Sequence, residues 1–195
     1  MDSADWDSYA KFYDEKSDHG LSDPAVKQKW NLLITSHLPS TPIRIIDLGG
    51  GTGSITQLLA EVGHNVTYVD SSFEMTKLAK IKCSEFGDQI KFLTCPVEEL
   101  DQHLEASQFD VIFARFILMG VNDLSLTLKK WHELLKDGGY FLFIEGYGAI
   151  QSGITPEALR DAVRIEMGVA TSISFNESEN WEYDAEDKRY LIISK

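Results

Sequence analysis

Residues 47–53 read Asp-Leu-Gly-Gly-Gly-Thr-Gly and decide the fold, because they separate an apolar run from a helical segment. The run before them, residues 43–46, has the β-branched composition of a buried strand. The segment after them, residues 54–62, has the pattern of a helix, and Gly63 is placed to end it. Glycines at such a turn let the backbone approach a ligand, and ligands of open α/β sheets bind beyond the carboxyl ends of the strands. The stretch therefore predicts a ligand site at the first strand-to-helix turn.

The rest of the chain alternates between strand and helix patterns. Further strands are predicted over residues 66–69, 90–93, 109–114, 140–144, 169–175 and 189–193, and further helices over 73–86, 97–106, 124–136 and 156–167. This alternation predicts an α/β fold with a doubly wound, mostly parallel sheet of seven strands. No helix fits between the last two strands, so we expect residues 176–187 to form a long hairpin and the last strand to be antiparallel.

Two helical segments precede this core. The first covers residues 5–17, and the second begins with Asp23 as its cap and Pro24 at its first position and runs to about Ser36. We expect one domain, with residues 1–40 as a helical lid or cap and residues 43–195 as a Rossmann-like core. In the helix over 124–136, Leu126, Trp131, Leu134 and Leu135 are expected to face the core.

Composition excludes several classes of protein. The 195 residues are 43% hydrophobic and 25% charged, which are ordinary globular values. The net charge of −13 repels phosphate backbones, so nucleic acid is not an expected partner. We expect no membrane span and no signal peptide, because no stretch approaches 18 apolar residues and the first residues are acidic and polar. Cys83 and Cys95 are expected to be reduced thiols of a cytoplasmic protein.

The glycine spacing indicates which ligand the loop binds. A dinucleotide fingerprint, G-x-G-x-x-G, that starts at Gly49 would end at Ser54, so the chain does not match it. The spacing present is G-x-G-x-G, and the Gly-Lys-Ser/Thr of a P-loop is also missing. Asp70 ends the second predicted strand, where a carboxylate accepts hydrogen bonds from the hydroxyls of a ribose. Loop and acid together predict a nucleoside site.

These motifs resemble those of the class I S-adenosylmethionine-dependent methyltransferases. The resemblance is carried by the Asp-x-Gly-x-Gly-x-Gly loop, by Asp70, and by the segments 109–112 and 135–139. The resemblance extends upstream to residues 6–14 and downstream to residues 187–191, so it covers nearly the whole chain. It is strongest for small bacterial members of the family. It implies the strand order 3-2-1-4-5-7-6, a transferase activity and S-adenosylmethionine as cofactor.

The resemblance also implies a role for individual residues. Those expected at the cofactor are Tyr9, Tyr13, Asp47, Gly49, Gly51, Gly53, Asp70, Ser71, Met75, Arg115 and Phe116. The glycines would line the methionine and ribose, Asp47 would support the methionine amino end, and Asp70 would bind the ribose beside Ser71. Met75 would lie near the adenine, Arg115 and Phe116 would flank the methionine end, and the tyrosines would form part of a lid or simply pack on the core.

Two positions depart from the family pattern. Pro96 stands where the family often has an Asp that accepts a hydrogen bond from the adenine. We expect the backbone of Val97 to meet the adenine instead, with Glu98 as a substitute acceptor or as a helix-capping charge. Gly50 replaces a more usual small side chain, which is expected only to loosen the loop.

Methyl transfer is an in-line displacement that needs alignment and, for an oxygen acceptor, profits from a base. Glu145 follows the fifth predicted strand and His19 lies between the leading helices, so these two are the candidate catalytic residues; Tyr147 also follows that strand. The alternatives are a strand-end role for Glu145 and a solvated loop position for His19. No histidine spacing suggests a metal, and none is expected.

A small-molecule acceptor is expected, because no inserted domain is present and residues 116–119 are apolar. The acidic segment 176–187 also contains Trp181 and Tyr183, a composition that favours an amine-bearing or aromatic acceptor unless it is only a solvated hairpin. Competing interpretations are a nicotinamide-dependent oxidoreductase, which the glycine spacing disfavours, and a cofactor- or protein-binding module without catalysis. The chain is expected to be a monomer or a homodimer.

Overall fold

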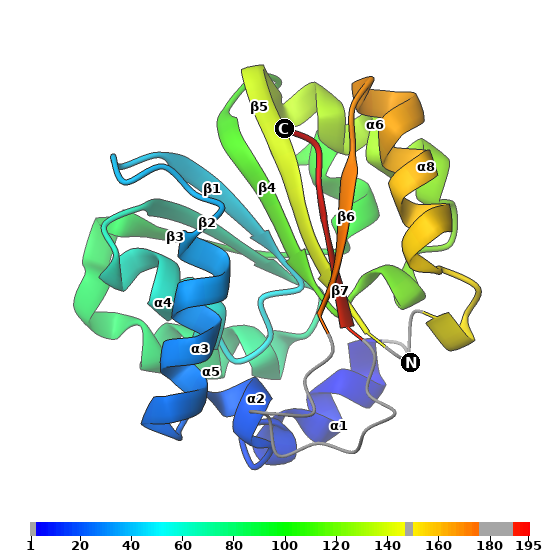
Figure 1. Cartoon of the computed structure of the whole chain (residues 1–195). Coiled ribbons are helices and arrows are strands. Elements are labelled where there is room, and N and C mark those ends of the chain that lie inside the picture. The colour runs from blue at the N-terminus through cyan, green and yellow to red at the C-terminus, as the bar shows by residue number, and fades with distance from the viewer. Residues whose placement is uncertain (1–2, 147–149, 176–188) are drawn as a thin grey trace. The chain divides into compact units, whose positions relative to one another are not determined.

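The computed structural model describes residues 3–146, 150–175 and 189–195, without the side chains of Ser17 and Phe175 (Figure 1). The chain divides into two compact units, one ending at Val97 and the other beginning at Glu98. Tyr147 and the whole acidic segment 176–187, with its expected hairpin, lie outside the described residues. Within the described ranges, no helix is long and apolar enough to cross a membrane.

The first unit contains three parallel strands with β2 in the middle. The strands are β1 (Arg44–Leu48), β2 (Asn65–Asp70) and β3 (Ile90–Thr94). Helices α4 (Ser54–Glu61) and α5 (Phe73–Lys82) follow the first two strands, and the 3-10 helix η1 (Ser84–Gln89) leads into the third. The interior of β1 and most of β2 are buried, as their apolar runs predict, whereas β3 is partly exposed. Leu48 pairs with Val69, so β1 and β2 end side by side.

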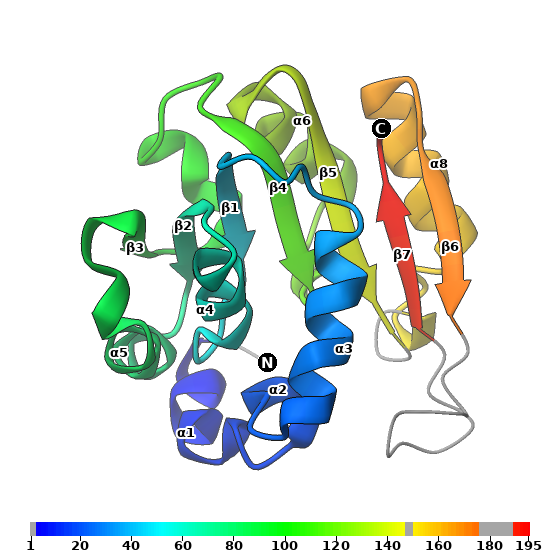
Figure 2. The same ribbon diagram turned by 60° about the vertical axis from the view of Figure 1, so that its left-hand side comes forward.

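Three leading helices complete this unit: α1 (Ser3–Tyr13), α2 (Ser17–Gly20) and α3 (Pro24–Thr35). The cap predicted for α3 is confirmed, because the Asp23 carboxylate accepts hydrogen bonds from the amides of Ala25 and Val26. The single helix predicted over 5–17 is wrong. Helix α1 ends at Tyr13, where the apolar spacing ends, and a separate short helix, α2, begins at Ser17. Helix α1 packs against α5, and both leading helices α1 and α2 lie beyond the carboxyl ends of β1 and β2 (Figure 2).

The second unit contains β4 (Phe109–Arg115), β5 (Leu135–Glu145), β6 (Thr171–Phe175) and β7 (Arg189–Ile193). Strands β4 and β5 are parallel, while β7 is antiparallel to both β5 and β6. Helices α6 (Leu124–Leu134) and α8 (Pro156–Met167) pack against each other and onto the strands. The seven strands follow the order β3-β2-β1-β4-β5-β7-β6, which confirms the predicted topology and the antiparallel last strand.

Several predicted boundaries were wrong. The helix predicted over 73–86 ends at Lys82, and that predicted over 97–106 is the 3-10 helix η2 (Val97–Gln102). Strand β5 already begins at Leu135, which pairs with Phe109, although the next pair joins Val111 to Tyr140. The intervening residues of β5 therefore bulge, and Gly138 allows this with its φ of 78°. The Gly-Gly pair marks a bulge inside the strand and not the start of it.

One predicted core residue of α6 is also wrong. Trp131, Leu134 and Leu135 are buried as expected, but the side chain of Leu126 is 52% exposed. Leu128 is buried in its place, at 1% exposure. The buried positions 128, 131 and 134 follow one another at the helical spacing of three residues, and Leu126 falls outside this stripe.

Replacing these two leucines by alanine separates the core face of α6 from its solvent face. Leu128→Ala is expected to lower the free energy of unfolding by about 2–4 kcal/mol, because it leaves a cavity. Leu126→Ala should change it by less than about 0.5 kcal/mol. Urea denaturation followed by circular dichroism measures both, and equal losses for the two variants would contradict the assigned face.

Candidate functional site

The glycine loop between β1 and α4 has the conformation that its spacing requires. Gly49, Gly51 and Gly53 have φ values of 64°, 54° and 83°, in the region that side-chain-bearing residues disfavour. The G-x-G-x-G pattern is therefore a backbone requirement at every second residue. The two residues between these glycines, Gly50 and Thr52, do not have a positive φ and are constrained by their neighbours instead.

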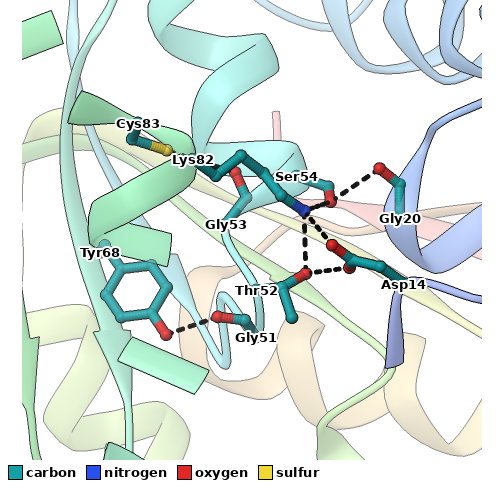
Figure 3. A network of polar contacts seen from close by, with 9 residues as sticks. All are labelled: Asp14, Gly20, Gly51, Thr52, Gly53, Ser54, Tyr68, Lys82 and Cys83. Atoms are coloured by element: carbon teal, nitrogen blue, oxygen red, sulfur yellow. Dashed lines mark hydrogen bonds and ion pairs between the residues drawn. The ribbon is translucent and has the colours of Figure 1, made fainter. Parts of the chain in front are cut away.

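Gly50 is required by a neighbouring ring and not by its own φ. A Cβ atom on Gly50 would lie 2.4 Å and 2.5 Å from Cδ2 and Cε2 of Tyr68. The expectation that Gly50 only loosens the loop therefore needs correcting, since the Tyr68 ring of β2 occupies the space of the missing side chain. The Tyr68 hydroxyl also donates a hydrogen bond to the carbonyl of Gly51, at 2.6 Å (Figure 3). Burial raises the pKa of Tyr68, which keeps this hydroxyl a donor.

Asp70 ends β2 directly beside the loop. Its Oδ2 accepts a hydrogen bond from the Gly51 amide at 2.9 Å, and its Oδ1 accepts one from the Ser72 amide at 2.8 Å. Burial raises the pKa of this carboxyl, and the two amide bonds oppose that rise. A carboxylate offers about four acceptor positions, so these two bonds orient the group and leave further acceptor capacity.

Asp47 lies at the base of the loop. Its side chain is 2% exposed, and Thr56 of α4 donates a hydrogen bond to its Oδ2 at 2.5 Å. A Cβ atom on Gly50 would also lie 3.3 Å from this oxygen. The acid is thus held between the end of β1 and the first turns of α4.

The leading helices place aromatic side chains against the loop. A Cβ atom on Gly51 would lie 3.2 Å from Cε1 of Tyr13, so this ring covers the middle of the loop. Trp6, Tyr9 and Tyr13 meet edge to face, with ring centroids 6.2–6.4 Å apart. The His19 ring stacks on Tyr13 with a centroid distance of 4.4 Å. Tyr13 therefore has the position of a lid residue, and Tyr9 and His19 flank it.

Asp7 is a residue of the site that sequence reasoning missed. Its Oδ1 accepts hydrogen bonds from the Ser72 hydroxyl at 2.5 Å and from the Glu74 amide at 3.0 Å. The Ser72 hydroxyl bond, followed by the Glu74 amide bond, lowers the pKa of this carboxyl. The contact fastens α1 to the N-terminus of α5, next to Asp70. Asp7 follows no periodic pattern, and its place inside the segment 6–14 is the one sequence signal that could have identified it.

Two further predicted cofactor residues lie at and just before the start of α5. Ser71 precedes the helix and is exposed, whereas Met75 in its first turn is 2% exposed. The cap of the helix is Ser72, whose hydroxyl accepts a hydrogen bond from the Met75 amide. Ser71 is therefore accessible next to Asp70, and Met75 is packed in the interior.

The other predicted site residues belong to the second unit or to the junction. Val97 opens η2, and the Glu98 carbonyl accepts a hydrogen bond from Lys130 at 3.1 Å. Phe116 follows β4 with a φ of 60°, unusual for a residue with a side chain. The Arg115 and Arg189 guanidinium groups each lie 5.3 Å from the centroid of its ring. The adenine role of Glu98 and the methionine roles of Arg115 and Phe116 stay predictions.

Glu145 ends β5 and is 1% exposed. Its Oε1 accepts hydrogen bonds from the amides of Ile117 and Leu118, at 3.0 Å and 2.9 Å. Burial raises the pKa of Glu145 to about 7, although the two amides lower it. The carboxyl therefore has two properties at once, because it fixes the turn after β4 and it titrates near neutral pH.

The described residues contain no group of three His, Cys, Asp or Glu side chains arranged to hold a metal ion. Cys83 and Cys95 are both buried and form no disulfide, and Cys83 Sγ donates a weak hydrogen bond to the carbonyl of Gly53 at 3.6 Å. Cys83 thus serves the packing of the glycine loop.

Comparison with known proteins gives a consistent result. Residues 46–143, about half of the chain, match the model of a methyltransferase domain. The chain is 30% identical over 100 residues to the ubiquinone biosynthesis O-methyltransferase of Bordetella avium, covering 51% of this chain and 41% of that protein. It is 33% identical over 140 residues to the malonyl-[acyl-carrier protein] O-methyltransferase of Priestia megaterium, covering 71% and 48% respectively. The chain thus spans less than half the length of these curated relatives.

A solved structure shows the same fold. It is the phosphoethanolamine N-methyltransferase 2 of Haemonchus contortus, in complex with phosphomonomethylethanolamine and S-adenosylhomocysteine. The TM-score is 0.68 at 16% sequence identity, and the match covers 85% of this chain and 51% of that chain.

The contact between Gly50 and Tyr68 predicts the effect of two substitutions. Gly50→Ala is expected to displace the Tyr68 ring and lower the free energy of unfolding by about 1–3 kcal/mol, as overpacking does. Tyr68→Phe keeps the ring and should cost about 1 kcal/mol, the contribution of one hydrogen bond. Thermal unfolding measures both, and a Gly50→Ala variant as stable as the wild type would disprove the steric conflict.

The pKa of Glu145 predicts a pH-dependent loss of stability. The folded protein binds this proton more tightly than the unfolded chain, so the stabilisation is complete below about pH 4.5 and is lost as the pH rises through about 7. Glu145→Gln keeps an oxygen acceptor and removes the titration. Relative to this variant, the wild type should lose about 3 kcal/mol of unfolding free energy between pH 4.5 and 8. A stability difference that stays constant in urea titrations across this range would show an unperturbed carboxyl.

Proposed function

Because the chain belongs to the class I S-adenosylmethionine-dependent methyltransferase family, we propose that it transfers the methyl group of S-adenosylmethionine to a small-molecule acceptor. The observation that carries this proposal is the Asp70 carboxylate, held by the Gly51 and Ser72 amides beside the glycine loop. Together with the glycine loop, this carboxylate would form a recognition surface for a ribose.

The residues of the first unit fit this cofactor. Gly49, Gly51 and Gly53 leave the loop backbone without side chains where the methionine and ribose would lie. Asp47, held by Thr56, would support the amino end of the methionine. We assign the lid to Tyr13, which covers Gly51, and to its neighbour Tyr9.

The remaining cofactor contacts are proposed from the positions that match the family's motifs. Ser71, Met75, Val97 and Glu98 would surround the adenosine, and Arg115 and Phe116 the methionine end. The sulfonium supplies an activated methyl group, so the protein's task is to align the acceptor with it and exclude water.

Glu145 is the proposed general base. A carboxyl with a pKa of about 7 is half ionised at neutral pH, where a base works best. In this role it would take the proton from an acceptor hydroxyl as the methyl group transfers, or from an acceptor ammonium before the transfer, so that the free amine attacks the methyl group. The alternative is a purely structural role through the Ile117 and Leu118 amides. His19, stacked on Tyr13, is proposed as an acceptor contact or a second base.

The acceptor is proposed to be small and partly apolar. The named relatives and neighbours methylate different groups, so their acceptors do not identify this one. Of the apolar segment 116–119, Leu118 is fully buried, Phe116 and Ile117 are partly buried and Met119 is 54% exposed, so Met119 is the most accessible of the four to an acceptor. An amine-bearing or aromatic acceptor stays our prediction from the composition of segment 176–187. The state of the protein, monomer or homodimer, and its location in the cytoplasm also stay predictions.

Isothermal titration with S-adenosylmethionine and S-adenosylhomocysteine tests the proposal. The wild type should bind both, and Asp70→Asn should weaken binding by about tenfold or more, since it removes the charged acceptor of two ribose hydroxyls. The matched control is Asp88→Asn, an exposed carboxylate of the same unit, which should bind like the wild type.

Two other outcomes would change the assignment. Preference for NAD, or no binding of either S-adenosyl compound, would overturn the cofactor assignment. Binding without formation of S-adenosylhomocysteine across a panel of phenols, amines and carboxylic acids would favour a cofactor-binding module without catalysis.

A further inference from the structure

Lys82, the last residue of α5, makes three hydrogen bonds that no sequence pattern indicates. Its Nζ donates to Asp14 Oδ2 at 2.8 Å, to Thr52 Oγ1 at 3.1 Å and to Ser54 Oγ at 2.7 Å (Figure 3). An ammonium group has three N–H donors, so each of them has an acceptor. Asp14 belongs to the leading segment, whereas Thr52 and Ser54 belong to the glycine loop and the start of α4. One cation thus joins the helix after Asp70 to both.

The two hydroxyls extend these bonds back to the leading segment. The Thr52 hydroxyl donates to Asp14 Oδ1, and the Ser54 hydroxyl donates to the carbonyl of Gly20 at 3.1 Å. Both ends of residues 14–20 are therefore tied to the loop. A Cβ atom on Gly20 would lie 2.5 Å from the Asp14 carbonyl oxygen, so these two ends touch each other. We call the five residues Asp14, Gly20, Thr52, Ser54 and Lys82 the loop latch.

The loop latch is adjacent to the proposed cofactor contacts on both sides. Thr52 stands between Gly51 and Gly53, and Gly51 donates its amide to Asp70. Tyr13, the ring that covers Gly51, directly precedes Asp14. A shift of Asp14 away from Lys82 would therefore move the lid ring and release Thr52 at the same time.

Lys82 also differs from an ordinary helix lysine. Its side chain is 20% exposed, against 57% for Lys77 of the same helix, whose ion pair with Glu74 lies within one turn. Exposed pairs such as Lys77–Glu74 contribute little, because water screens them and both side chains lose entropy. Lys82 instead joins three chain segments through hydroxyls that have defined donor and acceptor roles.

We propose that Lys82 is a positioning residue for cofactor binding, which makes closure of residues 14–20 and ordering of the glycine loop one coupled event. It acts through Thr52 and Ser54 on the loop and through Asp14 on the lid. The inference rests on the proposed function, since it concerns the retention and release of the S-adenosyl ligand. Departure of this ligand then requires the Lys82–Asp14 contact to break.

The test uses the full chain and S-adenosylhomocysteine as the probe. Lys82→Met keeps the length of the side chain and removes its donors, and Lys77→Met is the matched control on α5. Lys82→Met is expected to speed dissociation of S-adenosylhomocysteine by roughly tenfold, with Lys77→Met unchanged. Asp14→Asn should have the same direction, and adding it to Lys82→Met should have no further effect, because both break one network.

Two more readouts separate positioning from general stability. Thr52→Ser keeps the relaying hydroxyl and should retain slow dissociation, whereas Thr52→Val should lose it. Amide hydrogen exchange of residues 14–20 should be slow in the wild type without ligand, slower still with S-adenosylhomocysteine, and fast in Lys82→Met under both conditions.

Each result decides a different question. Unchanged dissociation and exchange in a folded Lys82→Met variant would overturn the inference while the proposed function stands, and so would equal effects of Lys77→Met. If Lys82→Met does not fold, Asp14→Asn and the Thr52 pair give the same measurements. A wild type that does not bind S-adenosylhomocysteine would overturn the proposed function, and exchange of residues 14–20 without ligand would still show whether the loop latch closes them.

Discussion

The hydrogen bond from the Gly51 amide to the Asp70 carboxylate connects the ends of two adjacent parallel strands, and the geometry of the first unit depends on it. It requires the Gly51 amide to face β2, which only a loop with alternating positive φ values allows. It requires the Asp70 carboxylate to be buried, although burial favours its neutral form. The Ser72 amide offsets part of that cost, and Ser72 in turn is held by Asp7 of α1.

The same bond explains why the leading helices belong to the site. Helix α1 contacts the start of α5 through Asp7, and Asp14, which directly follows α1, contacts the last residue of α5. These two polar contacts hold the helix against α5, and the Tyr13 ring lies over Gly51. The proposed lid is thus held by polar contacts and an aromatic cluster.

Regular patterns made most of the fold and the centre of the site predictable from the sequence. Strand and helix periods predicted the seven strands and the antiparallel last strand, whereas the order of the strands came from the family resemblance. The glycine spacing and Asp70 indicated the ligand loop and its acid. Contacts between side chains far apart in the sequence follow no such period. The position of the Tyr68 ring at Gly50 and the hydrogen bond from Lys82 to Thr52 depend on how β2 and α5 pack. The bulge in β5 escaped prediction, because the pairing of Leu135 with Phe109 extends the strand beyond the local break signal of Gly138. The ends of the short helices also differ from the predicted bounds. The roles of Glu98, Arg115 and Phe116 at a cofactor are still predictions.

The fit of the Tyr68 ring into the space beside Gly50 has a consequence for how such a chain can change. A side chain at position 50 of the loop and the tyrosine at position 68 of β2 would occupy the same space. The residue that one position accepts therefore depends on the residue at the other. A substitution at either position is acceptable only on a background set by the other. Mutational libraries that vary the loop alone will recover only glycine at position 50. Libraries that vary positions 50 and 68 together can also recover a side chain at position 50 with a smaller residue at position 68. Substitutions at position 50 of the loop and at position 68 of the strand beneath it are therefore expected to occur together.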